Sequence, residues 1–187
     1  LQDLLQRVPY EQRWSVISLR EKMAVSGKEG DPGRLDERFV HWLWQEQRFD
    51  SESLETIDGQ RVQVISPGWR SRQEGPDFKQ AVILIGTVLN VSVRNPEGRG
   101  TGAVKKRKGD IEVHVHSSDW ASHKHSKDPR YNEVILHVVF RTNRGDGGVR
   151  TAKDRPLPEV ELSRFLEEDL DLLRQDFLGV DFPPHNP

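Results

Sequence analysis

Cysteine is absent from the 187 residues of this chain. Its absence excludes disulfide bonds, thiolate zinc sites and cysteine nucleophiles, and it is consistent with a reducing, cytoplasmic location, which we expect. Long apolar runs are absent too, since no stretch approaches the roughly 18 residues that a membrane span needs. We therefore expect no membrane partner.

The chain also lacks an excess of positive charge. Its formal net charge is −2, although 31% of its residues are charged. A general polycationic surface for nucleic acid is thereby excluded, and any such surface must be local. The length suffices for one domain with a substantial core.

Breaks in the sequence pattern suggest three regions. Residues 1–33 read as a helical extension that ends in a linker, Gly-Lys-Glu-Gly-Asp-Pro-Gly. Residues 34–165 form the predicted core domain, and residues 166–187 a C-terminal helix with a Pro-rich tail. The hydrophobic periodicity predicts the following elements in chain order: an amphipathic helix at 35–49, strands at 60–66, 78–89 and 110–116, a short helix at 118–127, a strand at 133–140, a short strand near 159–162 and a helix at 163–177.

The segment 110–116, Asp-Ile-Glu-Val-His-Val-His, alternates strictly between apolar and polar residues. This pattern is typical of a half-buried strand, with Ile111 and Val113 on one face and the polar side chains on the other. Every residue of that polar face can bind a metal ion or transfer a proton: Asp110, Glu112, His114 and His116.

Asp77 follows Gly75-Pro76 at the start of the preceding predicted strand. Carboxylates on two adjacent strands, Asp77 and Glu112, would supply the hard oxygen ligands that Mg²⁺ prefers. An ordinary turn residue would also explain Asp77, because Asp is common after Pro in turns.

The element order, with Pro76-Asp77 on the second strand and Glu112-Val113-His114 on the third, resembles the PD-(D/E)xK nuclease superfamily. More specifically, Gly-Pro-Asp-Phe, Gly-Asp-Ile-Glu-Val-His-Val, Ser-Asp-Trp-x-x-His-x-His and Tyr-Asn-x-Val-Ile-Leu-His-Val-Val are similar to a bacterial family, domain of unknown function 2851. The resemblance covers roughly residues 35–165. It implies an α/β fold with a restriction-endonuclease-like core (helix, three strands, helix, strand) and additional terminal helices.

The superfamily resemblance also implies a function, metal-dependent cleavage of DNA or RNA. Asp77 and Glu112 would bind Mg²⁺ or Mn²⁺ together with the main-chain carbonyl of Val113, and the metal would activate a water molecule. His114 occupies the position of the superfamily's usual lysine, where a neutral imidazole could act as a base. Further candidates for this site are Glu37, Asp110 and His116.

Residues 94–108 carry six cations and one acid, interrupted by glycines and a proline. We predict a flexible basic loop in which Lys105, Lys106, Arg107 and Lys108 attract phosphates. A solvated hairpin tip would have the same composition.

Two other functions fit the same residues. A zinc hydrolase would use the imidazoles of His114, His116, His123 and His125, because imidazole suits zinc. A non-catalytic nucleic-acid-binding module would keep the fold without the chemistry. His137, inside an apolar run, is predicted to be a hydrogen-bonded core histidine. The choice between DNA and RNA and the oligomeric state stay open.

Overall fold

The computed structural model describes residues 35–87, 104–143, 145 and 148–179. The predicted helical extension at 1–33 lies outside these residues, as does the Pro-rich tail at 180–187. The chain divides into two compact units, Val40–Glu167 and a second that combines Leu1–Phe39 with Glu168–Pro187. The domain boundaries expected from the sequence stay predictions.

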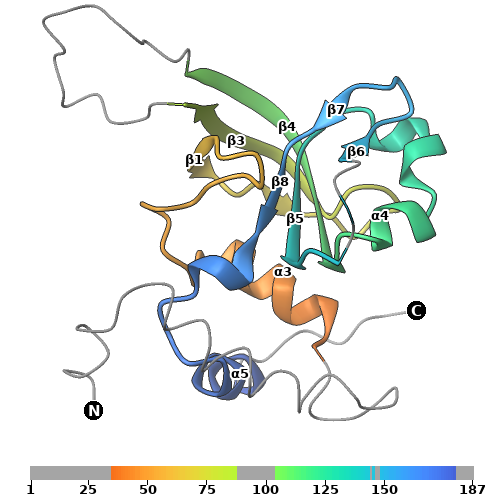
Figure 1. Cartoon of the computed structure of the whole chain (residues 1–187). Coiled ribbons are helices and arrows are strands. Elements are labelled where there is room, and N and C mark those ends of the chain that lie inside the picture. The colour runs from red at the N-terminus through yellow and green to blue at the C-terminus, as the bar shows by residue number, and fades with distance from the viewer. Residues whose placement is uncertain (1–34, 88–103, 144, 146–147, 180–187) are drawn as a thin grey trace, which may run out of the picture. The chain divides into compact units, whose positions relative to one another are not determined.

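The unit Val40–Glu167 is a mixed α/β structure built on one large sheet (Figure 1). β1, β3 and β4 are antiparallel neighbours, whereas β5 runs parallel to β4 and β8 parallel to β5. The predicted central position of strand 110–116 is confirmed. The order across the sheet is β1 (Arg61–Ser66), β3 (Phe78–Gly86), β4 (Lys105–His116), β5 (Val134–Arg141) and β8 (Glu159–Glu161), with β2 (Trp69–Arg70) also paired to β3. A second small sheet joins β6 (Val149–Arg150) to β7 (Pro156–Leu157).

The strand β5 is buried along almost its whole length. β5 reads Val-Ile-Leu-His-Val-Val-Phe-Arg, and its residues from Val134 to Phe140 are all buried. Such a continuous apolar run is typical of a strand with parallel neighbours. Gly109 of β4 allows close contact with β5, because a Cβ at this position would lie 2.5 Å from the carbonyl oxygen of Glu133.

The predicted flexible loop at 94–108 is wrong for its last residues. β4 already begins at Lys105, and Lys105 to Lys108 pair with Ile85 to Val82 of β3. Lysine and arginine tolerate this position because their aliphatic stems lie along the strand while the charged ends reach water. Residues 94–103 lie outside the described part of the chain.

The helices are shorter than the periodicity predicts. α3 covers Glu37–Gln45 and ends before Gln47, which has a positive φ of 52°. The predicted helix at 118–127 divides into α4 (Asp119–Ser122) and the 3-10 helix η1 (His125–Lys127), followed by η2 (Pro129–Tyr131). Lys124 has a left-handed φ of 63°, which interrupts the helix.

The predicted helix at 163–177 is also replaced by two elements. The 3-10 helix η3 covers Leu162–Phe165, and α5 covers Leu170–Leu178 in the second unit. The side chain of Asp169 caps α5 by accepting a hydrogen bond from the backbone N–H of Asp171. Of the helices in the described ranges, none is long and apolar enough to cross a membrane.

Candidate metal centre

The polar face of β4 is buried rather than half-exposed. Asp110, Glu112 and His114 are only 8%, 4% and 1% exposed. The expectation that this face meets solvent is wrong, because α4 packs on β4, and His123 and His125, which follow α4, lie against His114 and Glu112. Buried carboxylates and imidazoles are costly unless they are paired, so the contacts of these side chains are informative.

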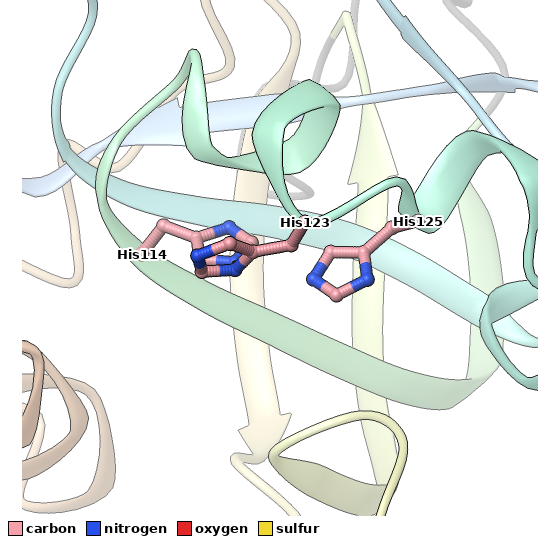
Figure 2. A group of neighbouring side chains, drawn as sticks. All are labelled: His114, His123 and His125. Atoms are coloured by element: carbon pink, nitrogen blue, oxygen red, sulfur yellow. The ribbon is translucent and has the colours of Figure 1, made fainter.

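The imidazoles of His114, His123 and His125 lie close together (Figure 2). One ring nitrogen of each of His114, His123 and His125 lies within 4.8 Å of those of the other two. His114 Nε2 lies 3.1 Å from His123 Nδ1 and 3.4 Å from Glu112 Oε1. His125 Nε2 lies 3.0 Å from the same Glu112 oxygen. We call Glu112, His114, His123 and His125 the imidazole cluster.

The backbone after α4 brings the two later histidines to β4. His123 ends α4, Lys124 turns the chain with its left-handed φ of 63°, and His125 begins η1. The ring of His125 stacks on Tyr131 with 3.8 Å between centroids and meets Trp120 edge-on at 5.3 Å. A non-glycine residue held in the left-handed region is strained, and such strain concentrates at functional sites.

The distances within the imidazole cluster fit a tetrahedral metal site. With metal–ligand bonds of about 2.0–2.1 Å, the ligand atoms of a tetrahedral zinc site are about 3.3 Å apart. The three separations given above, 3.1, 3.4 and 3.0 Å, lie close to this value. His125 Nε2 is buried and has no hydrogen bond of suitable geometry within the described structure, although Glu112 Oε1 is near. Proximity without an aligned hydrogen bond is expected of two ligands that share one cation.

The surroundings keep the imidazoles of His114 and His125 neutral. Burial, reinforced by the neighbouring imidazoles of His123 and His137, lowers the pKa of His125 from 6.5 to about 4. Burial and the same kind of neighbours lower the pKa of His114 strongly. A neutral imidazole has a lone pair for a metal ion, so both residues are ready to bind one near pH 7.

Behind His114 lies a buried chain of two further side chains. His114 Nδ1 is 2.8 Å from His137 Nε2, and His137 Nδ1 is 2.6 Å from Glu159 Oε2. These residues come from β4, β5 and β8, which are consecutive in the sheet. The prediction that His137 is a hydrogen-bonded core histidine is confirmed.

Asp77 and Glu112 are brought together, as expected for a shared site. The backbone N–H of Asp77 donates to Glu112 Oε2 at 3.3 Å, and the backbone N–H of Val113 donates to Asp77 Oδ2 at 2.9 Å. The Glu112 carboxylate therefore accepts a hydrogen bond from the backbone of Asp77. The Asp77 carboxylate accepts one from β4, the strand that carries Glu112. Val113 contributes its N–H to this arrangement.

Asp77 has a further contact with α3. Its Oδ2 lies 3.2 Å from His41 Nε2, and Arg70 donates through a guanidinium nitrogen to His41 Nδ1 at 3.0 Å. Because arginine can only donate, His41 Nδ1 accepts, and the neutral ring then carries its proton on Nε2, which faces Asp77. Arg70 and His41 thereby support the position of the Asp77 carboxylate.

The remaining candidates, Asp110, His116 and Glu37, are not members of the imidazole cluster. Asp110 accepts from Lys79 Nζ at 2.9 Å and from the backbone N–H of Gln80 at 3.3 Å, so an ion pair occupies it. His116 is half-exposed, and its Nδ1 lies 4.0 Å from Asp119 Oδ2. Glu37, the first residue of α3, belongs to the other compact unit.

Four basic residues, Lys105 to Lys108, begin β4, and most of them are exposed. Lys105, Lys106 and Lys108 are exposed, whereas Arg107 is half-buried. Burial, together with the positive charge of Arg155, lowers the pKa of Arg107. The three lysines are therefore the most exposed residues of this group.

Sequence reasoning missed Glu159, His41 and Tyr131 as neighbours of the site. Their only signal was the chemical type of the residue: Glu159 opens the short strand β8, and His41 lies on the amphipathic helix. Neither pattern shows which distant strand or loop the side chain meets.

The comparisons with known proteins give a family. The family model described as "Protein of unknown function (DUF2851)" matches residues 37–178. Neither a curated protein nor a solved structure matches the chain.

Proposed function

Because the chain belongs to the DUF2851 family, whose description assigns no activity, we propose from the site itself that it is a metal-dependent hydrolase that cleaves phosphodiester bonds in nucleic acid. The observation that carries the proposal is the imidazole cluster. Three separations among its ring nitrogens and Glu112 Oε1, 3.1, 3.4 and 3.0 Å, are near those of a tetrahedral metal site, and the ring nitrogens of the three histidines lie within 4.8 Å of one another. Asp77 is connected to this cluster because its backbone N–H donates to Glu112 Oε2.

The donor set favours a zinc-class ion. Imidazole ligands suit zinc and other late transition metals, whereas Mg²⁺ prefers oxygen ligands alone. Glu112, His114, His123 and His125 would hold the ion, and expansion to a fifth ligand would let it activate a water molecule and the phosphoryl oxygen. His123 is exposed while the other three are buried, so substrate and water would approach from the side of His123.

The residues of the chain have distinct roles in this proposal. By the resemblance to the PD-(D/E)xK nucleases, His114 would correspond to their lysine, and its strongly lowered pKa keeps it neutral. A neutral His114 contributes a lone pair to the cluster rather than a positive charge. Asp77 fixes Glu112 and β4 through the paired hydrogen bonds and supplies a second carboxylate beside the cluster.

The sheet order supports nucleic acid as the substrate class. The order helix, three antiparallel strands, helical crossover and parallel strand in α3, β1, β3, β4, α4 and β5 is the order expected of a restriction-endonuclease-like core. Asp77 precedes β3 and Glu112 lies on β4, which are the positions of the two acids in that pattern. The lysines at the start of β4 would bind the phosphate backbone.

Two alternatives follow from specific contacts. The apposition of Asp77 and Glu112 would suit Mg²⁺ or Mn²⁺, the ions implied by the PD-(D/E)xK resemblance. A closed site with four protein ligands would suit a structural zinc ion on a non-catalytic nucleic-acid-binding module, because catalytic zinc sites keep one position open.

A cleavage assay tests the proposal. The full chain is stripped of metal with a chelator, reloaded with Zn²⁺, Mn²⁺ or Mg²⁺, and incubated with labelled single- and double-stranded DNA and RNA. We expect cleavage that requires metal and is lost in Glu112→Gln and His114→Gln. His116→Gln, on the same strand but outside the imidazole cluster, should cleave normally.

Each alternative has its own outcome in this assay. Activity with Mg²⁺ or Mn²⁺ that survives His123→Gln would favour the carboxylate pair over the imidazole cluster. Bound zinc without cleavage of any substrate would overturn the hydrolase proposal and favour the structural alternative.

A further inference from the structure

We propose that His137 and Glu159 are positioning residues that fix the tautomer of His114, so that its Nε2 lone pair faces the imidazole cluster. This inference rests on the proposed metal centre and extends it to two residues that do not touch the metal site. We call His114, His137 and Glu159 the relay.

The relay is a linear chain of contacts from His114 through His137 to Glu159. His114 Nδ1 lies 2.8 Å from His137 Nε2, and His137 Nδ1 lies 2.6 Å from Glu159 Oε2. A separation of 2.6 Å is short for an N–H···O contact, as expected when the acceptor is charged. All three side chains are buried, at 1%, 0% and 8% exposure, so water does not compete for these groups.

The proton positions follow from the chemistry of the groups. A carboxylate can only accept, so the contact with Glu159 places a proton on His137 Nδ1. A neutral His137 then has a lone pair on Nε2, which must accept from His114 Nδ1. With its proton on Nδ1, His114 presents an unprotonated Nε2 to His123 and Glu112, which lie 3.1 and 3.4 Å away.

The sheet makes this arrangement rigid. His137 pairs directly with Glu159 across β5 and β8, and Glu112 pairs with His137 across β4 and β5. The relay therefore depends on strand register rather than on flexible loops. A metal-binding histidine commonly donates its second N–H to a carboxylate or carbonyl, which orients the ring and strengthens it as a ligand. Here the N–H of His114 would be donated to His137, and His137 in turn donates to the Glu159 carboxylate.

The chain offers a matched control on the same strand. Glu161 of β8 also accepts hydrogen bonds, from Thr142 Oγ1 at 2.6 Å and from Ser163 Oγ at 3.1 Å. It pairs with Val139 of β5, not with His137. Glu161→Gln therefore removes the same charge from β8 without touching the relay.

Two measurements on the full chain test the inference. The first is zinc affinity, from competition with a chromophoric chelator. Glu159→Gln should weaken zinc binding about 10–100-fold, the usual effect of losing such an outer partner, whereas Glu161→Gln should bind as the unsubstituted chain does. The second is the ring ¹⁵N–¹H spectrum of ¹⁵N-histidine-labelled, unsubstituted protein, with and without zinc, which reports the tautomer of each ring and needs no substitution.

The spectrum should show His114 and His137 protonated on Nδ1 and unprotonated on Nε2. A proton on His114 Nε2, or a His137 ring protonated on both nitrogens, would overturn the inference, as would equal zinc affinity in the two glutamine variants. If the unsubstituted chain binds no zinc at all, the metal centre fails, and the spectrum of the metal-free protein still decides the tautomer of His114.

Discussion

The backbone N–H of Asp77 donates to Glu112 Oε2, while Asp77 Oδ2 accepts from the backbone N–H of Val113, next to Glu112. Asp77, which precedes β3, and Glu112, in β4, are thus held in place by these two hydrogen bonds. This pair fixes the direction in which the Glu112 carboxylate enters the imidazole cluster.

Asp77→Ala should lower the free energy of unfolding by about 1–3 kcal/mol, because it leaves the N–H of the fully buried Val113 without its acceptor. Urea denaturation of the metal-free protein measures the change. Glu74→Ala, which removes an exposed carboxylate that pairs with Arg130, should change stability by less than about 1 kcal/mol. Equal effects of the two substitutions would show that the Asp77 contacts do not hold the strands.

The stability of the metal-free protein should depend on pH through His125. Its folded-state pKa is about 4 and its ordinary value 6.5, so between these values the unfolded chain binds more protons than the folded one. The free energy of unfolding should therefore fall as the pH is lowered from about 6.5 to about 4, and His125 should cause no further loss below that range.

The difference between the unsubstituted chain and His125→Gln isolates this contribution, measured by urea denaturation at several pH values. The variant should lose less stability over the window. His116→Gln, outside the imidazole cluster, should keep the pH dependence of the unsubstituted chain. If the free energy of unfolding depends on pH in the same way for His125→Gln and the unsubstituted chain, His125 has the same pKa in the folded and unfolded states, which contradicts the prediction.

Gly109→Ala should destabilise the sheet beside the site by at least about 1–3 kcal/mol, the usual effect of overpacking. The new Cβ would lie 2.5 Å from the carbonyl oxygen of Glu133, a backbone atom that cannot move aside without breaking the pairing of β4 with β5. Gly145→Ala is the control, since no described atom lies within 4 Å of its Cβ. Thermal unfolding compares the two, and similar midpoints would exclude the close packing of β4 on β5.

The exposed lysines at the start of β4 should contribute to nucleic-acid binding. Replacing Lys105 and Lys106 by Ala should weaken binding to a single-stranded oligonucleotide, and the slope of log Kobs against log salt concentration should decrease by about 0.7 for each phosphate that the variant no longer neutralises. The double variant Lys127→Ala with Lys153→Ala removes the same charge elsewhere on the surface. If both double variants bind alike, the β4 lysines have no specific role.

The sequence predicts the sheet well because each central strand has a local signal. The alternation at 110–116 and the apolar run at 133–140 both correspond to strands, and the predicted central place of the first is observed. The same alternation gives the wrong burial, because it cannot show that the segment after α4 folds over Glu112 and His114.

The site was predictable only in part, for the same physical reason. Glu112 and His114 were identified from one strand, whereas the approach of His125 depends on the left-handed turn at Lys124. The contact of His137 with Glu159 depends on the register of two parallel strands whose partners are separated by 22 residues. Such pairings are set by packing of the whole sheet, and a local pattern does not encode them.

Metal stoichiometry of the purified full chain is the most direct measurement of the proposed centre. After extensive dialysis against buffer containing zinc and then against metal-free buffer, we expect about one tightly bound zinc ion per chain, as in a site with these four ligands. His125→Gln should lose the ion while remaining folded by circular dichroism, and His116→Gln should retain it. A folded, unsubstituted chain without bound metal, or equal zinc content in all three proteins, would contradict a metal centre at Glu112, His114, His123 and His125.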